Sequence, residues 1–171
     1  MYYSLFDSHL NYANILWGCA TNKQLKKIVT LQKKCVRNVA KLPYKAHTEP
    51  IFKVLGILNL HDKLTYSRSV FMHQYKNDKL PNSFANMFSD IPDSNLQTRH
   101  NDYNYLNEPA NKSYLENFPR KKLISSWNAL EIDLKATAEA IEFKNLLNES
   151  LLSKYNLEPD CNDKNCQSCE L

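Results

Sequence analysis

The stretch TNKQLKKIVTLQKKCVRNVAKLP, residues 21–43, has the apolar pattern of a long helix. Its apolar residues recur every three or four positions, which is typical of one face of an α-helix. These residues are Leu25, Ile28, Val29, Cys35, Val36 and Val39. Thr21 or Asn22 is the expected N-cap, and Pro43 is expected to close the helix. The stretch therefore predicts one amphipathic helix. It is the first evidence for the all-α fold that we predict for the whole chain.

The face opposite these apolar residues is basic. Seven cations project from it within an arc of about a third of a turn. This basic stripe consists of Lys23, Lys26, Lys27, Lys33, Lys34, Arg37 and Lys41. With Lys45, eight basic and no acidic residues lie between Asp7 and Glu49, so this segment carries +8 and the rest of the chain −4, against a net charge of +4. A merely solvated helix face usually mixes both signs, so one sign favours a phosphate backbone as partner.

Residues 2–18, YYSLFDSHLNYANILWG, predict a second amphipathic helix with Gly18 as its C-cap. A helical wheel gives it an apolar face of Tyr2, Leu5, Phe6, His9, Leu10, Tyr12, Ala13, Leu16 and Trp17. The opposite face holds Ser4, Asp7, Ser8, Asn11 and Asn14. A face with so many rings needs a partner surface, either from the rest of the chain or from outside it.

Further helices are predicted along the chain. A short one follows Thr48 as N-cap, with Pro50 in its first turn. The others cover residues 60–79, 119–134 and 137–156, and residues 80–88 suggest a short turn or helix. Residues 89–111 have no helical period, and so long a loop is either functional or disordered. Short extended pieces are expected around 103–106 and 113–115.

The composition supports an all-α chain. Only two of its 171 residues are glycine, Gly18 and Gly56, which excludes Gly-rich phosphate loops. We expect an irregular bundle of about five to seven helices with one long irregular loop and a frayed C-terminal tail. The expected organisation is a helical pair over residues 1–45, a helical region over 46–157 that contains the loop 89–111, and a tail over 158–171.

The sequence predicts no membrane span and no signal peptide, because it lacks both a long apolar run and a charged leader. Five cysteines, two of them scattered in helices, argue against a disulfide framework. We therefore expect an intracellular protein of the nucleus or cytoplasm.

Seven segments follow one another in an order that resembles a known family. They are SHLNYANILWG (8–18), LQKKCVR (31–37), HTEPIFKVLGILNL (47–60), FMHQYKNDKLPNSF (71–84), TRH (98–100), SWNAL (126–130) and FKNLLNESLLSKY (143–155). The chain resembles the C-terminal end of non-LTR (jockey-like, LINE-type) retrotransposon polyproteins, downstream of the reverse transcriptase palm. No single segment is specific, but the ordered series is.

The resemblance implies a thumb and post-palm region of an RNA-directed DNA polymerase. Fingers and palm, with the aspartates that hold two metal ions, would lie upstream of Met1. The chain alone is then expected to be no enzyme and to need no cofactor, and its first helix would pack on palm-side helices. Two departures stand out: Ala13 replaces a usual Gly, and Ser125 and Ser126 replace a frequent Gly-Pro.

The expected partner is the backbone of RNA or DNA, bound through the basic stripe. The alternative is a helical protein-interaction module, including self-association, that uses the aromatic face of the first helix. The loop residues Arg99, His100, Tyr103 and Tyr105 mix base with aromatic and suit stacking on single strands, unless the loop is disordered.

No catalytic or metal site is predicted. Cys161, Cys166 and Cys169 are one ligand short of a tetrahedral zinc site, which Cys19, Cys35 or a second chain would have to complete. The histidines are dispersed, so no catalytic group of side chains can be nominated. We expect His9 and Cys35 to be packed side chains, and Trp17 and Trp127 to be core anchors.

Overall fold

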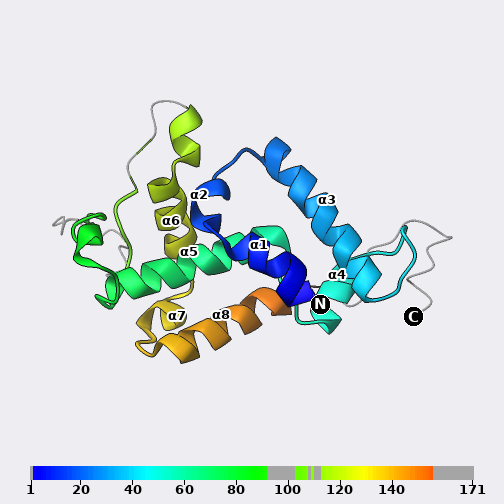
Figure 1. The fold of residues 1–171 in the computed structure, drawn as a ribbon. Helices are drawn as coiled ribbons and strands as arrows, with labels where there is room; N and C mark the ends of the chain where they lie inside the picture. The colour runs from blue at the N-terminus through cyan, green and yellow to red at the C-terminus, as the bar shows by residue number, and fades with distance from the viewer. Residues whose placement is uncertain (1, 92–102, 108, 110–112, 156–171) are drawn as a thin grey trace. The chain divides into compact units, whose positions relative to one another are not determined.

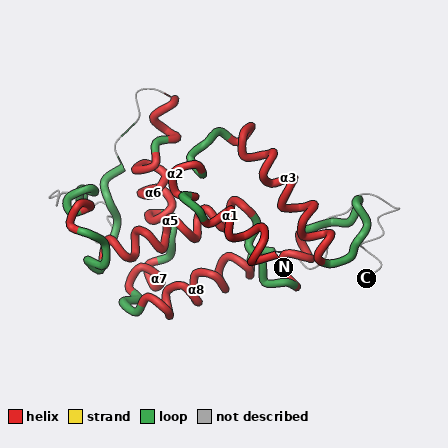
Figure 2. Tube along the Cα trace, viewed as in Figure 1, coloured by secondary structure: helices red, strands yellow, loops and turns green. Residues whose placement is uncertain are grey.

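The computed structural model describes residues 2–91, 103–107, 109 and 113–155. In this part of the chain Figure 2 shows helices and loops and no strand. The described residues form eight α-helices, one π-helix and two 3₁₀-helices, several of them a single turn long. Asp90 and Tyr105 form an isolated antiparallel bridge. The predicted all-α class is confirmed.

The chain divides into two compact units. Unit 1 consists of Met1–Leu64 and Asn148–Leu171, and unit 2 of Thr65–Leu147. Two helices, α5 (Leu60–Lys76) and α8 (Ala140–Ser153), begin in one unit and end in the other. These limits differ from the division expected from the sequence, because unit 1 takes in residues from both parts of the chain.

The first segment is not the single helix predicted for residues 2–18. It consists of η1 (Tyr2–Asp7, a π-helix), α1 (Ser8–Asn11) and α2 (Asn14–Trp17), with Gly18 as C-cap. The chain breaks at Tyr12, which is extended, and at Ala13, whose φ of 49° is left-handed. A wheel at 3.6 residues per turn fails here because π-turns and a left-handed residue both change the direction of the side chains that follow.

The π-turns of η1 and the break after α1 change which side chains of this segment are buried. Tyr2 and Leu10 are buried as predicted, but so are Asp7 and Asn14 from the predicted polar face. Three residues of the predicted apolar face, Leu5, Tyr12 and Leu16, are exposed. His9 is exposed as well, so its assignment as a packed side chain was wrong.

The long helix predicted from residue 21 is present as α3 (Asn22–Val39). Thr21 is its N-cap, and Thr21 and Gln24 form a capping box. The helix ends four residues before Pro43, at Val39. Its end is a left-handed turn at Lys41, with φ of 55°, after which the amide of Leu42 donates to the carbonyl of Arg37 at 3.0 Å.

The core of unit 1 consists of two clusters of buried side chains. One contains Tyr2, Val36, Ile51, Phe52, Ile57 and Tyr155, and the other Leu10, Leu25, Leu60 and Leu64. The short helix α4 (Glu49–Val54) follows Thr48 and has Pro50 in its first turn, as predicted. Tyr2 therefore finds its packing partners within its own unit. Gly18 permits close packing, because a Cβ there would meet the side chain of Leu64.

Unit 2 contains most of α5, the short helices η2 (Asn82–Phe84) and η3 (Ser113–Asn117), α6 (Pro119–Asn128), α7 (Ile132–Ala136) and the start of α8. The helix predicted for residues 119–134 is broken into α6 and α7, and residues 113–115 are helical rather than extended. The largest fully buried side chains of this unit are Trp127, Phe143, Met72, Leu123, Leu147 and His73.

Trp127 and Asn128, neighbours on α6, bind the backbone of residues 103–105, which belong to the predicted loop 89–111. The indole of Trp127 donates to the carbonyl of Tyr103 at 2.7 Å. The Asn128 amide accepts from the backbone N–H of Tyr105 at 3.1 Å and donates to its carbonyl at 2.8 Å. Trp127 is a core residue as predicted, whereas Trp17 is only half-buried and bonds to the carbonyl of Tyr12.

Candidate nucleic-acid interface

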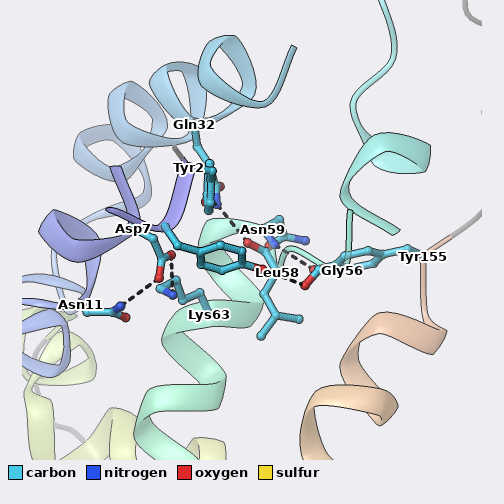
Figure 3. A network of polar contacts seen from close by, with 10 residues as sticks. Tyr2, Asp7, Asn11, Gln32, Gly56, Leu58, Asn59, Lys63 and Tyr155 are labelled. Atoms are coloured by element: carbon cyan, nitrogen blue, oxygen red, sulfur yellow. Dashed lines mark hydrogen bonds and ion pairs between the residues drawn. The ribbon is translucent and has the colours of Figure 1, made fainter. Parts of the chain in front are cut away.

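One buried polar side chain fixes the rotation of α3. Gln32, 1% exposed, donates to the hydroxyl of Tyr2 at 2.8 Å and to the carbonyl of Leu58 at 2.9 Å. Figure 3 shows Gln32 reaching from α3 to Tyr2. Because Gln32 lies on the same face as Leu25 and Val36, the opposite face of α3 is left to solvent. The sequence pattern gave no reason to place a glutamine in the core.

Six residues of the basic stripe lie on α3, and the five lysines among them are exposed. Within the described residues, Lys23, Lys26 and Lys27 form no ion pair. Lys33 lines a hollow of about 430 Å³ that Glu49 and Asp62 also line. The positive charge on the first half of α3 is therefore the least balanced part of the stripe.

Two carboxylates of unit 1, Asp7 and Asp62, are engaged by groups other than the basic stripe. Asp7 pairs with Lys63 at 2.6 Å and accepts from the amide of Asn11 at 2.9 Å. Figure 3 shows this pair beside η1 and α5. The charge of the buried Asp7 is thus matched locally, so that removal of Lys63 would leave an unpaired buried carboxylate.

The other carboxylate belongs to a clamp around Tyr155. The hydroxyl of Tyr155 donates to Asp62 at 2.5 Å and accepts from the backbone of Asn59 at 2.9 Å. Lys53 donates to the carbonyl of Tyr155 at 2.6 Å. Burial raises the pKa of Tyr155, and its hydrogen bond to Asp62 raises it further. Asp62 is therefore committed to holding the end of α8.

The last two members of the basic stripe differ from the five exposed lysines of α3. Nε of Arg37 donates to the carbonyl of Ala46 at 2.8 Å, and its guanidinium lies 5.7 Å from the ring centre of Tyr44. Arg37 is half-buried and ties the end of α3 to the segment that follows. Lys41 lies beyond the helix in the left-handed turn. Spacing alone did not reveal the tertiary contacts of Arg37, whereas Lys41 remains exposed.

The geometry of α3 suits contact with a phosphate backbone. Eighteen residues at about 1.5 Å each give a length of about 27 Å, which passes several successive phosphates. Lysine ammonium groups supply charge without a fixed hydrogen-bonding plane, so they attract phosphate without reading bases. The arrangement supports binding that does not depend on nucleotide sequence.

Of the four loop residues that suit stacking on single strands, the structure describes Tyr103 and Tyr105. Tyr105 is buried against Phe88 and Tyr75, so its ring is closed to a base. The ring of Tyr103 lies 3.7 Å from the ammonium of Lys76. Arg99 and His100 lie outside the described residues.

Cys161, Cys166 and Cys169 also lie outside the described residues. Where the structure describes the chain, no three His, Cys, Asp or Glu side chains are grouped to hold a metal ion. Cys19 is buried, and Cys35 is half-buried, with the pKa of its thiol raised by burial. In the same part of the chain no helix combines the length and apolarity that a bilayer span requires.

Comparisons of the chain with known protein families, with curated proteins and with solved structures found no match. The exposed lysines of α3, held in place from behind by Gln32, are the feature with the clearest chemical meaning.

Proposed function

We propose that the chain binds the sugar-phosphate backbone of RNA or DNA through α3. The observation that carries this proposal is the row of exposed lysines without ion-pair partners among the described residues. Like charges on one helix repel one another, and an approaching row of phosphates relieves that repulsion while releasing condensed counterions.

We further propose that the chain derives from the post-palm end of a non-LTR retrotransposon reverse transcriptase. The ordered series of segments from residue 8 to residue 155 supports this origin. Ala13 adds support, because its left-handed φ of 49° is a conformation in which glycine, the usual family residue there, is unstrained. An in-frame or decayed palm with paired aspartates, encoded upstream of Met1, is the test of this origin.

On this proposal the 171 residues supply nucleic-acid contacts and no polymerase chemistry. Two-metal transfer needs convergent carboxylates on a rigid scaffold, and Asp7 and Asp62 are engaged in contacts of their own. Primer extension with Mg²⁺ or Mn²⁺ should give no product above background, and template-dependent incorporation by the purified chain would refute this part of the proposal.

The binding proposal is tested by titrating a labelled duplex with the protein between about 50 and 200 mM salt. Engagement of four to six phosphates would give a log–log slope of about −4 to −5. Changing Lys23, Lys26 and Lys33 together to Gln should reduce the slope by about two to three units, because each lost phosphate contact removes about one.

A matched control removes the same charge from elsewhere. Lys79, Lys122 and Lys154 lie outside α3, so their joint change to Gln should leave the slope close to that of the unaltered protein. Circular dichroism should show both triple variants folded. Equal slopes for the two variants would make the basic stripe an ordinary solvated face and end the binding proposal.

A further inference from the structure

η1 and α3 form an apolar groove of about 400 Å³ within unit 1. Its floor includes Phe6 and Cys35, and its edges include Leu5 on η1 and Leu31 on α3. Leu5 is 63% exposed and Leu31 55% exposed. In a pocket for a small ligand the lining would be largely enclosed, whereas here the apolar edges stand open to a larger partner.

We propose that this groove binds an amphipathic helix of a partner protein, with acidic residues along one edge of its apolar stripe. This inference goes beyond the proposed nucleic-acid binding and does not depend on it. A helix docks into such a groove through apolar side chains spaced three or four residues apart, which matches a concave apolar surface between two helices.

The charge of the partner follows from one edge of the groove. Lys27, Leu31 and Lys34 follow one another at helical spacing on α3, and Lys34 itself lines the groove. Within the described residues neither lysine has a carboxylate partner. Carboxylates on a docked helix would supply one, and complementary charge of this kind fixes the orientation of a bound partner.

The same lysines disfavour a second copy of the chain as the occupant. A second copy docked groove to groove would offer Lys27 and Lys34 no carboxylate, because none of the residues that line the groove is acidic. An anionic membrane is a poorer match as well, because a membrane takes a protruding apolar face and this surface is concave.

The test uses a designed peptide of about four helical turns, with Leu at helical spacing and Glu along one edge of the Leu stripe. Fluorescence anisotropy measures its affinity for the full chain. The double variant Leu5→Ser, Leu31→Ser should bind at least about tenfold more weakly. A control variant, Tyr12→Ser, Leu16→Ser, changes two exposed apolar residues outside the groove and should bind the peptide normally.

Three results would overturn the proposal. One is equal binding by the groove variant and the control variant, or no peptide binding at all. Another is equal binding of a peptide with Lys in place of Glu. The third is a concentration-dependent dimer, or binding to anionic vesicles, that the Leu5→Ser, Leu31→Ser change removes, since either result would give the groove a different occupant. Since both leucines are largely exposed, the variant should fold, and circular dichroism with a urea unfolding curve serves as the check.

Discussion

In α3, Lys23, Lys26 and Lys27 extend into solvent without an ion-pair partner among the described residues. In unit 2, Lys135 on α7 is 2% exposed, and its ammonium donates to the side chain of Asn104 at 2.9 Å and to the carbonyl of Asn128 at 3.0 Å. Lys76 donates in turn to the carbonyl of Lys135 at 3.0 Å.

The two groups of lysines use the same side chain in different ways. Burial lowers the pKa of Lys76 and of Lys135, so both carry a cost that the α3 lysines in solvent do not. In return they link α5, α7 and residues 103–104. A lysine without a local partner is free for a ligand, whereas one that satisfies carbonyl oxygens is part of the fold.

The largest expected effect is the loss of nucleic-acid binding when the α3 lysines are reversed in charge. Changing Lys23, Lys26 and Lys33 to Glu should weaken duplex binding by about 100-fold or more, because three attractions become repulsions. Urea unfolding should change little. If the variant lost both binding and much of its stability, the contrast with the buried lysines of unit 2 would fail, because the α3 lysines would then also stabilise the fold.

The next largest effect concerns the buried Lys135. Its replacement should lower the stability of the protein and leave duplex binding unchanged. Lys135→Met keeps much of the buried side-chain volume but leaves two oxygen acceptors, on Asn104 and Asn128, without their donor. We expect a loss of about 2 kcal/mol in the free energy of unfolding. Duplex affinity at fixed salt should stay the same. Normal stability of the variant would show that the buried ammonium is replaceable.

Arg37→Gln tests a cation that belongs to the basic stripe and also forms a bond within the fold. It should cost about 1 kcal/mol of stability through the lost bond to Ala46. It should change the salt slope by less than one unit, because the guanidinium is already engaged. A full unit of slope lost without loss of stability would return Arg37 to the set of phosphate ligands.

The lowered pKa of the buried Lys135 also makes the free energy of unfolding depend on pH. An unfolded chain keeps the Lys135 proton up to about pH 10.5, whereas the folded chain releases it at lower pH. Stability of the unaltered protein should therefore rise as pH increases through the folded-state pKa toward 10.5. Lys135→Met lacks this gain, so the stability difference between the two proteins should grow with pH. Urea titrations at several pH values measure it, and a constant difference would contradict it.

The smallest expected effect concerns the break before α2. Ala13→Gly should raise the unfolding free energy by about 0.5–1 kcal/mol, because glycine adopts the left-handed conformation without the clash of a Cβ. Duplex affinity should not change. Ala85 is exposed and has no left-handed φ, so Ala85→Gly serves as the control and should not stabilise the protein. An equal gain in stability from both changes would remove the left-handed turn as the cause.

Local signals in the sequence located much of the fold. The position of α3, the cap at Thr21 and the start of α4 after Thr48 follow from helical period and capping chemistry. Trp127 was recognisable as a core residue because large aromatic side chains at helical spacing usually are. The exposed lysines of the basic stripe could also be predicted, because their position follows from helical spacing within α3 alone.

The remaining features depend on contacts between distant residues. Gln32 is buried because Tyr2 and Leu58 bond to it, and no pattern within α3 records that. The role of Arg37 depends on Ala46 in the same way. The sequence left both stacking and disorder open for the loop 89–111, because the residue that fixes Tyr105, Asn128, lies 23 residues away in sequence.

The clamp at Tyr155 has a consequence for biosynthesis. Its partners Lys53, Asn59 and Asp62 leave the ribosome about a hundred residues before Tyr155 does. Unit 2 is continuous in sequence, whereas the core of unit 1 is incomplete until Tyr155 has been made. A nascent chain is thus exposed to proteases and chaperones in its N-terminal unit for longest, and a premature stop before codon 155 would damage the part of the protein that was made first.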